Sequence, residues 1–364
     1  MFIQSIITDS YNRSYLNQVS TKKVMITPNN VISFNGGSTS AGAPLKRLRN
    51  ITCPYFGIKM IDNPTISHIQ KDLSGCKTIK KTTKYLSKYR DNMLTTEKGI
   101  FDRLSDASAD FSRKQIPLAL NDWYNDALTK LIIEEFTVLD EIDRMSLQLS
   151  PQMALQIHEI TMKCRETIFA NKEDNTFKRK NLITSIDKII PTKEEATQLD
   201  LIKDKTHFLP TSATSENAFI VKYAKRSHEE VAARIINPSA ISIEHIIPAS
   251  MGGKNELKNF LLVSAGANNL RQNTHLAKFI ARFPQITKFC QLSIDEIVQI
   301  INNGGLKGFE TYPYDVRNTL RYASGGLIKI NLTKMKYTKP EAAAMVKQAK
   351  DKILMYKNKK NESL

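Results

Sequence analysis

Apolar side chains recur at three- and four-residue spacings through the first half of the chain, which is the period of an amphipathic helix. The clearest run predicts a single helix over residues 118–143. A second helix should begin at Pro151, because proline is favoured in a first helical turn, and a third should cover 176–190. Residues 65–205 are therefore predicted to be mostly helical.

The pattern changes near residue 241. Short apolar runs separated by a glycine-containing loop predict two strands, and a helix should follow them. Just upstream, Ser227 and Glu230 form a capping-box pattern that predicts a helix over 227–236. The predicted order is strand 241–247, loop 248–258, strand 260–263 and helix 267–281.

The two ends of the chain look different. Residues 1–52 are expected to form strands and loops, with strands over 23–27 and 31–34. After residue 281 the sequence predicts mixed helix and loop, and the last twenty residues form a lysine-rich helix with a polar tail.

Composition narrows the class of protein. The chain has 364 residues, with 53 Lys and Arg against 36 Asp and Glu, a net charge of +17. This balance favours a polyanionic partner, with nucleic acid ahead of an acidic membrane surface. No apolar stretch approaches the roughly 20 residues of a membrane span, and no signal peptide is evident. Four widely spaced cysteines argue against disulfides, so a reducing, cytoplasmic location is expected.

The residues with the most chemical potential are Glu244 and His245 in the first predicted strand. Neighbouring strand residues point to opposite faces, so the two side chains can take different roles. An imidazole, with a pKa of about 6.5, suits a general base near neutral pH. A single strand histidine is more often structural, however, so the surrounding motif has to decide.

That motif resembles the HNH (ββα-metal) endonuclease family. The matching residues are Glu244-His245-Ile246-Ile247-Pro248, Gly252-Gly253, Asn259 before an apolar strand, and Asn268 opening a helix. The resemblance covers about 40 residues, and its strength lies in the ordered set rather than in any one residue. It implies a metal-dependent endonuclease or nickase that hydrolyses DNA phosphodiester bonds.

The resemblance also implies roles for particular residues. His245 would be the general base, Glu244 and Asn268 would bind the metal, and Asn259 would brace the loop and orient the imidazole. Gln272, one helical turn beyond Asn268, is a further candidate ligand. Oxygen ligands suit one hard cation, Mg²⁺ or Mn²⁺.

Several basic residues are candidate contacts for phosphates. Arg271 is the best of them, because it shares the helix with Asn268 and a guanidinium matches phosphate oxygens. A further basic face has Tyr85 and Tyr89 interleaved, which could be aromatic platforms or an ordinary solvated surface. The remaining candidates are Lys254 in the loop, Arg226 before the capped helix, and Lys80 and Lys84 on the basic face.

The sequence departs from the family at the two cysteine knuckles that often bind a structural zinc. The segments Cys53-Pro54-Tyr55-Phe56-Gly57 and Ser264-Ala265-Gly266-Ala267 keep the outline of the knuckles, but only Cys53 remains. No structural zinc is therefore expected. We expect residues 53–57 to lie beside 264–267, with Phe56 buried near Ala267, which would make the helical segment an insertion into the nuclease unit.

The predicted fold is mixed α/β and mainly helical, built around a ββα-metal unit with a large helical insertion. The predicted segments are an amino-terminal segment (1–64), a helical insertion that also binds DNA (65–205), the HNH module (206–290) and a carboxy-terminal helical segment (291–364).

Alternatives to a DNA endonuclease remain open. The leading one is a nucleic-acid-binding protein with an inactive HNH fold, which the lost cysteines favour and the intact Glu244, His245, Asn259 and Asn268 oppose. An RNA-directed nuclease, or a subunit that serves another catalytic chain, is a third class. A homo-oligomer, or a partner protein of a defence or mobile-element system, is conceivable.

Overall fold

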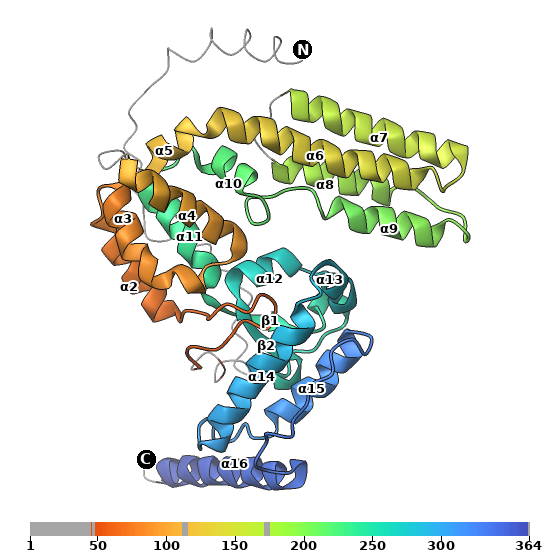
Figure 1. Cartoon of the computed structure of the whole chain (residues 1–364). Coiled ribbons are helices and arrows are strands. Elements are labelled where there is room, and N and C mark those ends of the chain that lie inside the picture. The colour runs from red at the N-terminus through yellow and green to blue at the C-terminus, as the bar shows by residue number, and fades with distance from the viewer. Residues whose placement is uncertain (1–44, 46–47, 111–115, 171–174, 363–364) are drawn as a thin grey trace. The chain divides into compact units, whose positions relative to one another are not determined.

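The structure is a computed structural model that describes residues 45, 48–110, 116–170 and 175–362 (Figure 1). The strands expected over 23–27 and 31–34 lie outside these residues. As predicted, the fold is mainly helical with a small antiparallel sheet. Within the described ranges, no helix is both long enough and apolar enough to cross a membrane.

Helices fill the chain before the sheet. The helix expected over 118–143 is interrupted at Trp123, whose backbone makes a tighter turn to Leu120 and whose ring lies under the Arg103 guanidinium. These helices are α2 (Asn63–Ser74), α3 (Ile79–Leu86), the 3₁₀ helix η4 (Ser87–Asn92), α4 (Thr95–Asp110), α5 (Ile116–Asp122), α6 (Tyr124–Ser146), α7 (Pro151–Phe169), α8 (Asn175–Asp187), α9 (Ala196–Thr206), α10 (Glu216–Tyr223) and α11 (His228–Ile236).

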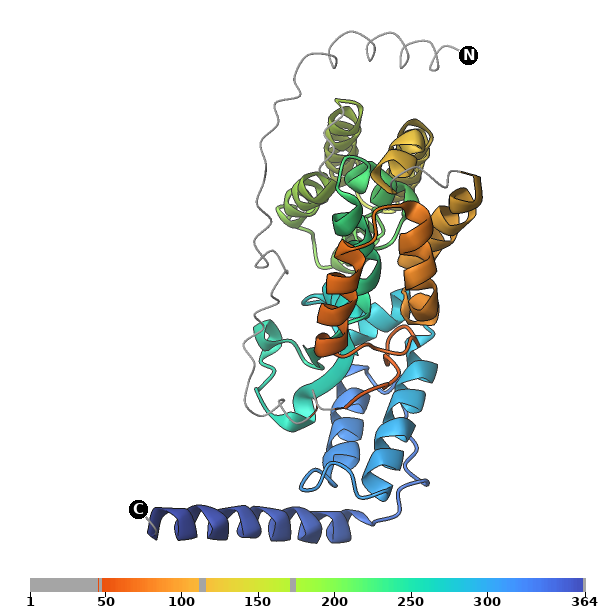
Figure 2. The ribbon, with the colours of Figure 1, turned by 90° about the vertical axis from the view of Figure 1, so that its left-hand side faces the viewer.

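These helices pack around two apolar cores. Helices α2 to α5, the start of α6, α10 and α11 share one core, which includes Ile100, Leu120 and Phe219. Helices α6 to α9 form a bundle around a second core, which includes Leu139 and Ile157 (Figures 1 and 2). The capping box at Ser227 and Glu230 is present, so the predicted start of α11 is confirmed.

The sheet is a hairpin of β1 (Ile241–His245) and β2 (Phe260–Ser264), paired antiparallel with His245 opposite Phe260. Every residue of β2 is buried, which explains its continuous apolar sequence. The helix predicted over 267–281 is in fact two helices, α12 (Ala265–Arg271) and α13 (Leu276–Arg282). Gln272 ends α12 with a φ of 50°, a conformation that an α-helix does not accept.

A third core holds the hairpin. It unites residues 45–60 with β2, α12, α13 and the later helices, although the first of these segments lies about 200 positions upstream. The core continues past residue 290 through α14 (Ile286–Asn302) and α15 (Tyr312–Ala323). Helix α16 (Lys339–Glu362) follows as a long helix at the carboxy-terminal end (Figure 2), and most of its described side chains are exposed.

Candidate active site in the hairpin and helix

His245 is the last residue of β1, and its imidazole is half-buried with the ring edge-on to Phe260. Its Nε2 atom lies 2.7 Å from Oδ1 of Asn255, in the loop between the strands. Because an amide oxygen only accepts hydrogen bonds, Nε2 carries the hydrogen and Nδ1 keeps its lone pair. Nδ1 is therefore the atom that can accept a proton from water.

Asn259 holds the loop closed, as the resemblance implies. Its Oδ1 accepts from the Ile247 backbone N–H at 2.8 Å, and its Nδ2 donates to the Ile247 and Lys254 carbonyls at 3.0 Å each. Gly253 makes this packing possible, because a Cβ there would lie 1.7 Å from the Ile247 carbonyl oxygen. With its amide used by backbone, Asn259 is a positioning residue rather than a reacting one, and the direct partner of the imidazole is Asn255.

Glu244 is buried, with 4% of its surface exposed, and forms an ion pair with Arg271 of α12 at 2.5 Å. The prediction that Arg271 contacts phosphate is wrong, because its side chain is 0% exposed and lies against β1. Its guanidinium also donates to the carbonyls of His245 and Ile246. Burial raises the pKa of the Glu244 carboxyl to about 7, and Arg271 partly offsets this rise.

Asn268 and Glu244 lie on the same side of β1. The Asn268 Nδ2 donates to Ser242 Oγ at 2.9 Å, and Ser242 and Glu244 share a face because they are two residues apart on a strand. Within the described residues, Glu244 Oε2 and Asn268 Oδ1 have no protein hydrogen-bond partner. One carboxylate and one amide oxygen fit a hard cation that keeps most of its water ligands.

Other candidate metal ligands are less well placed. Gln272 is exposed at the end of α12, in the turn that leads to α13. Over the described part of the chain, no three His, Cys, Asp or Glu side chains are grouped so that they could hold a metal ion. A cation in this site would therefore depend on the mixed pair of Glu244 and Asn268.

The two degenerate knuckles lie side by side, which confirms that prediction. The Cys53 Sγ is 3.6 Å from Ser264 Oγ and accepts from the Ser264 backbone N–H at 3.4 Å. Gly57, with a φ of +72°, closes the turn that begins at Cys53. Phe56 was expected to be buried near Ala267, which is wrong: it is half-buried, and its ring contacts are with Phe279 and Phe283 of α13.

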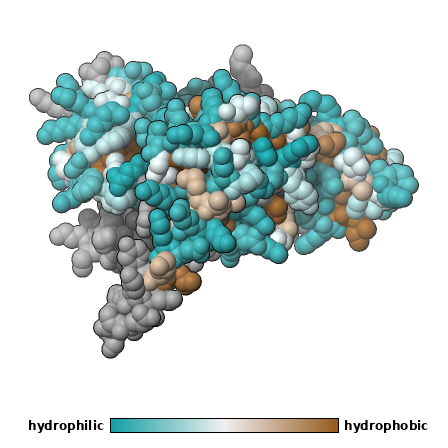
Figure 3. All heavy atoms as spheres, turned by 90° about the horizontal axis from the view of Figure 1, so that it is seen from below, coloured by the Kyte–Doolittle hydropathy of each residue, from teal (hydrophilic) through white to brown (hydrophobic). Residues whose placement is uncertain are grey.

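The basic residues that are candidate phosphate contacts differ in their ionic partners. Lys254, Lys80 and Lys84 are exposed, and Arg226, which precedes α11, is also exposed but lies 3.6 Å from Glu230 of that helix. Tyr85 and Tyr89 are not open platforms, because the Lys88 ammonium lies 4.1 and 5.0 Å from their ring centres. The face in Figure 3 is mainly hydrophilic, with apolar side chains in separate patches.

Comparison with known proteins agrees with this geometry. Residues 227–275, from the start of α11 to the turn before α13, match the family model described as HNH endonuclease. This segment is similar to HNH endonucleases, and the match supports nuclease activity on nucleic acid in general, with a divalent metal ion as that family's cofactor. Comparison with curated proteins found no match, and comparison with solved structures found none either.

Three residues of the site were not singled out from the sequence: Asn255, Tyr55 and Ser242. Asn255 could have been predicted, because the loop between the two strands has to pass the end of β1 and Asn255 is a polar residue of that loop. Tyr55 lies inside the degenerate knuckle, and its bond to Arg271 at 3.1 Å gives no sequence signal. Ser242 is two residues before Glu244, so strand alternation alone places it on the face of that carboxylate.

Proposed function

We propose that residues 241–271 form the active site of a metal-dependent DNA endonuclease or nickase. The observation that carries this proposal is the arrangement at the end of β1. His245, whose Nδ1 has no hydrogen-bond partner among the described residues, directly follows a carboxylate that shares its strand face with the Asn268 amide. The family match over 227–275 supports the same reading.

In this proposal His245 is the general base. Its Nδ1 takes a proton from a water molecule, the water oxygen attacks phosphorus, and the bond to the leaving 3′-oxygen breaks. Asn255 keeps the hydrogen on Nε2, and Asn259 holds the loop that carries Asn255. His245 then carries the proton until solvent removes it.

Glu244 and Asn268 would hold one Mg²⁺ or Mn²⁺, with Gln272 as a third candidate ligand. A bound cation would stabilise the charge that develops on the phosphate and on the leaving oxygen. Lys254 is exposed one residue before Asn255, so it is the basic side chain best placed for a phosphate next to the cut. Lys80, Lys84 and Arg226 would contact the backbone farther away, and the net charge of +17 favours such contacts.

The test is to incubate the metal-free protein with supercoiled plasmid, and separately with structured RNA. Each substrate is tested without metal, with Mg²⁺, with Mn²⁺, and with metal followed by chelator. We expect metal-dependent nicking or linearisation of the plasmid that chelator stops. Cleavage of RNA alone would overturn the choice of DNA. Plasmid binding with no cleavage under any of these conditions would instead support a nucleic-acid-binding protein with an inactive HNH fold.

A further inference from the structure

Arg271 is the largest side chain that is completely buried in the described chain, and its charge is met by four oxygen atoms. A buried guanidinium is costly, and here the Nε donor has no hydrogen-bond partner among the described residues, so the side chain is kept at some cost to stability. Nη1 lies 3.1 Å from Tyr55 Oη, 2.5 Å from Glu244 Oε1 and 2.7 Å from the His245 carbonyl oxygen, so its two hydrogens are shared among three acceptors. Nη2 donates to the Ile246 carbonyl at 2.6 Å.

Arg271 and its acceptors belong to three separate segments of the chain. Tyr55 lies in the first degenerate knuckle, Glu244 and His245 end β1, and Arg271 itself ends α12. One side chain therefore links the knuckle, the strand and the helix of the nuclease unit. It does so where the related family often uses a structural zinc, for which this chain lacks the cysteines.

Arg271 contacts the Glu244 carboxylate and the backbone at His245, but it has no hydrogen bond to the imidazole within the described part of the chain. Its hydrogen bonds to the His245 and Ile246 carbonyls hold the backbone of the residue that carries the imidazole and of the residue after it. Its bond to Oε1 fixes the plane of the Glu244 carboxylate and leaves Oε2 as the oxygen that can bind a cation. The position of both proposed functional groups thus depends on this guanidinium.

We infer that Arg271 is a positioning residue for the metal and the general base, acting through Glu244 Oε1 and the His245–Ile246 backbone. This inference rests on the proposed function. Lysine in its place keeps the charge but presents a single ammonium, which cannot reach acceptors on both sides as a planar fork does. Arg271→Lys should therefore loosen the carboxylate while leaving a charged partner for it.

The chain offers a matched control in the ion pair of Arg234, on α11, with Glu97, on α4. Their side chains are 18% and 2% exposed, and Arg234 also donates to the Ser212 carbonyl at 3.0 Å. This pair joins helices outside the hairpin. Arg234→Lys therefore tests what loosening a buried ion pair does to stability alone.

The experiment measures Mn²⁺ binding to the metal-free full-length chain by calorimetry, together with the melting temperature without metal. We expect Arg271→Lys to weaken Mn²⁺ binding by about 10- to 100-fold, the usual effect of losing a group that orients a metal ligand. Arg234→Lys should lower the melting temperature by a similar amount and leave Mn²⁺ affinity within about twofold of wild type.

The outcomes separate the inference from the proposed function. If the wild-type chain binds Mn²⁺ and cuts plasmid, but Arg271→Lys binds Mn²⁺ equally well, the inference is wrong and the function stands. If the wild-type chain neither binds Mn²⁺ nor cuts nucleic acid, the proposed function fails first. If Arg271→Lys does not fold, the Tyr55→Phe variant is tested in its place. It removes one acceptor of the guanidinium and should weaken Mn²⁺ binding about threefold or more. Unchanged Mn²⁺ affinity in this variant would overturn the inference.

Discussion

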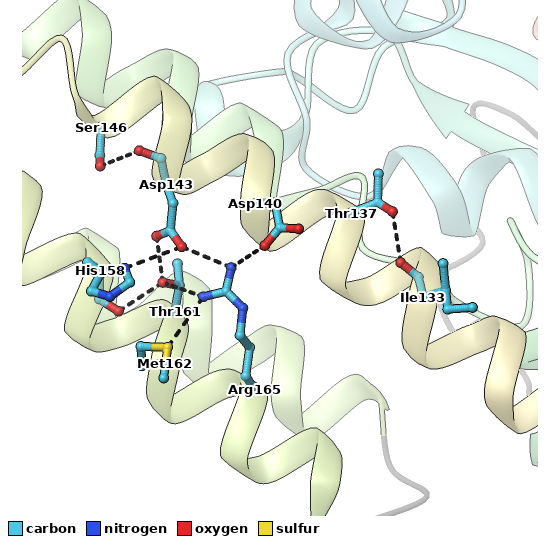
Figure 4. Close-up of polar contacts among 9 residues, drawn as sticks. All are labelled: Ile133, Thr137, Asp140, Asp143, Ser146, His158, Thr161, Met162 and Arg165. Atoms are coloured by element: carbon cyan, nitrogen blue, oxygen red, sulfur yellow. Dashed lines mark hydrogen bonds and ion pairs between the residues drawn. The ribbon is translucent and has the colours of Figure 1, made fainter. Parts of the chain in front are cut away.

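The hairpin unit and the α6–α9 bundle place their charged side chains differently. In the hairpin unit, Glu244 and Arg271 are buried together, and Arg271 also donates to the carbonyls of His245 and Ile246. In the bundle, Arg165 of α7 reaches Asp140 and Asp143 of α6 around an apolar core (Figure 4). The side chains there are 12% exposed for Arg165, 22% for Asp143 and 64% for Asp140, so water reaches the carboxylates, most of all Asp140.

The two kinds of ion pair differ in what they contribute to stability. Removing one member of a buried pair leaves an uncompensated charge, whereas an exposed pair contributes little because water and salt screen it. The core of the α6–α9 bundle is built from apolar residues, which stabilise it without a buried ion pair at its centre. The hairpin unit keeps its buried ion pair next to the proposed catalytic residues, whereas the buried pair of Glu97 and Arg234 joins two helices away from them.

The largest effect should come from the proposed base. We expect His245→Ala to reduce plasmid cleavage by about 10²- to 10⁴-fold, because it removes general-base catalysis. DNA affinity should change little, because phosphate contacts supply the binding. Gel-based nicking rates and fluorescence anisotropy on the same preparations measure the two quantities. Cleavage by the alanine variant at the wild-type rate would remove His245 from the mechanism.

The two arginines sharpen the comparison directly. Arg271→Met should lower the free energy of unfolding by about 3–5 kcal/mol, since it strands the buried Glu244 carboxylate. Arg165→Met should cost about 1 kcal/mol or less, because Asp140 and Asp143 can be rehydrated. Urea unfolding of both variants measures these values. Equal losses would break the proposed contrast between the two regions.

Sequence patterns predicted the parts of the site that are set locally. The capping box at Ser227 and the two short strands each depend on residues close in the chain, and the structure contains them. The hydrogen bonds of Asn259 within the loop are ones that the resemblance to the HNH family implied. The pairing of the knuckle segments was also predictable, because Cys53 and the replaced positions kept their spacing.

Burial and chain breaks could not be predicted in the same way. Arg271 has the appearance of a solvent-facing helix residue, and only Tyr55, more than 200 positions away, together with Glu244 makes its burial favourable. The break between α12 and α13 depends on the backbone of a single residue, Gln272, which carries no glycine or proline signal. Tertiary contacts decide such features.

A smaller effect should follow from the ring that replaces a zinc ligand. Phe56→Ala removes a half-buried ring from Phe279 and Phe283 and should cost about 1–2 kcal/mol of unfolding free energy. Phe169→Ala is the control in the bundle, because that ring is 59% exposed, and should cost less. Chemical unfolding in parallel measures both. A greater loss in the control would mean that Phe56 does not support the hairpin unit.

The smallest effect concerns a surface carboxylate of the bundle. Glu195 accepts from the Ser150 backbone N–H, and hydrogen bonds from Ser150 and Thr192 lower its pKa from 4.5 to about 2. A lowered folded-state pKa gives stability that is complete above 4.5 and is lost as the pH falls toward 2. Glu195→Gln should thus be slightly less stable than wild type at neutral pH, with the gap closing in acid. Thermal melts across this range measure it, and a constant gap would contradict the assignment.

The central claim is that Glu244 and Asn268 bind one divalent cation beside His245. Titration of the metal-free chain with Mn²⁺, followed by the paramagnetic resonance signal of the free ion, tests this most directly. The account predicts one Mn²⁺ per chain, bound by the wild type and by His245→Ala, and bound at least about tenfold more weakly by Glu244→Gln and Asn268→Ala. Absence of binding to the wild type, or equal binding by all four proteins, would contradict it.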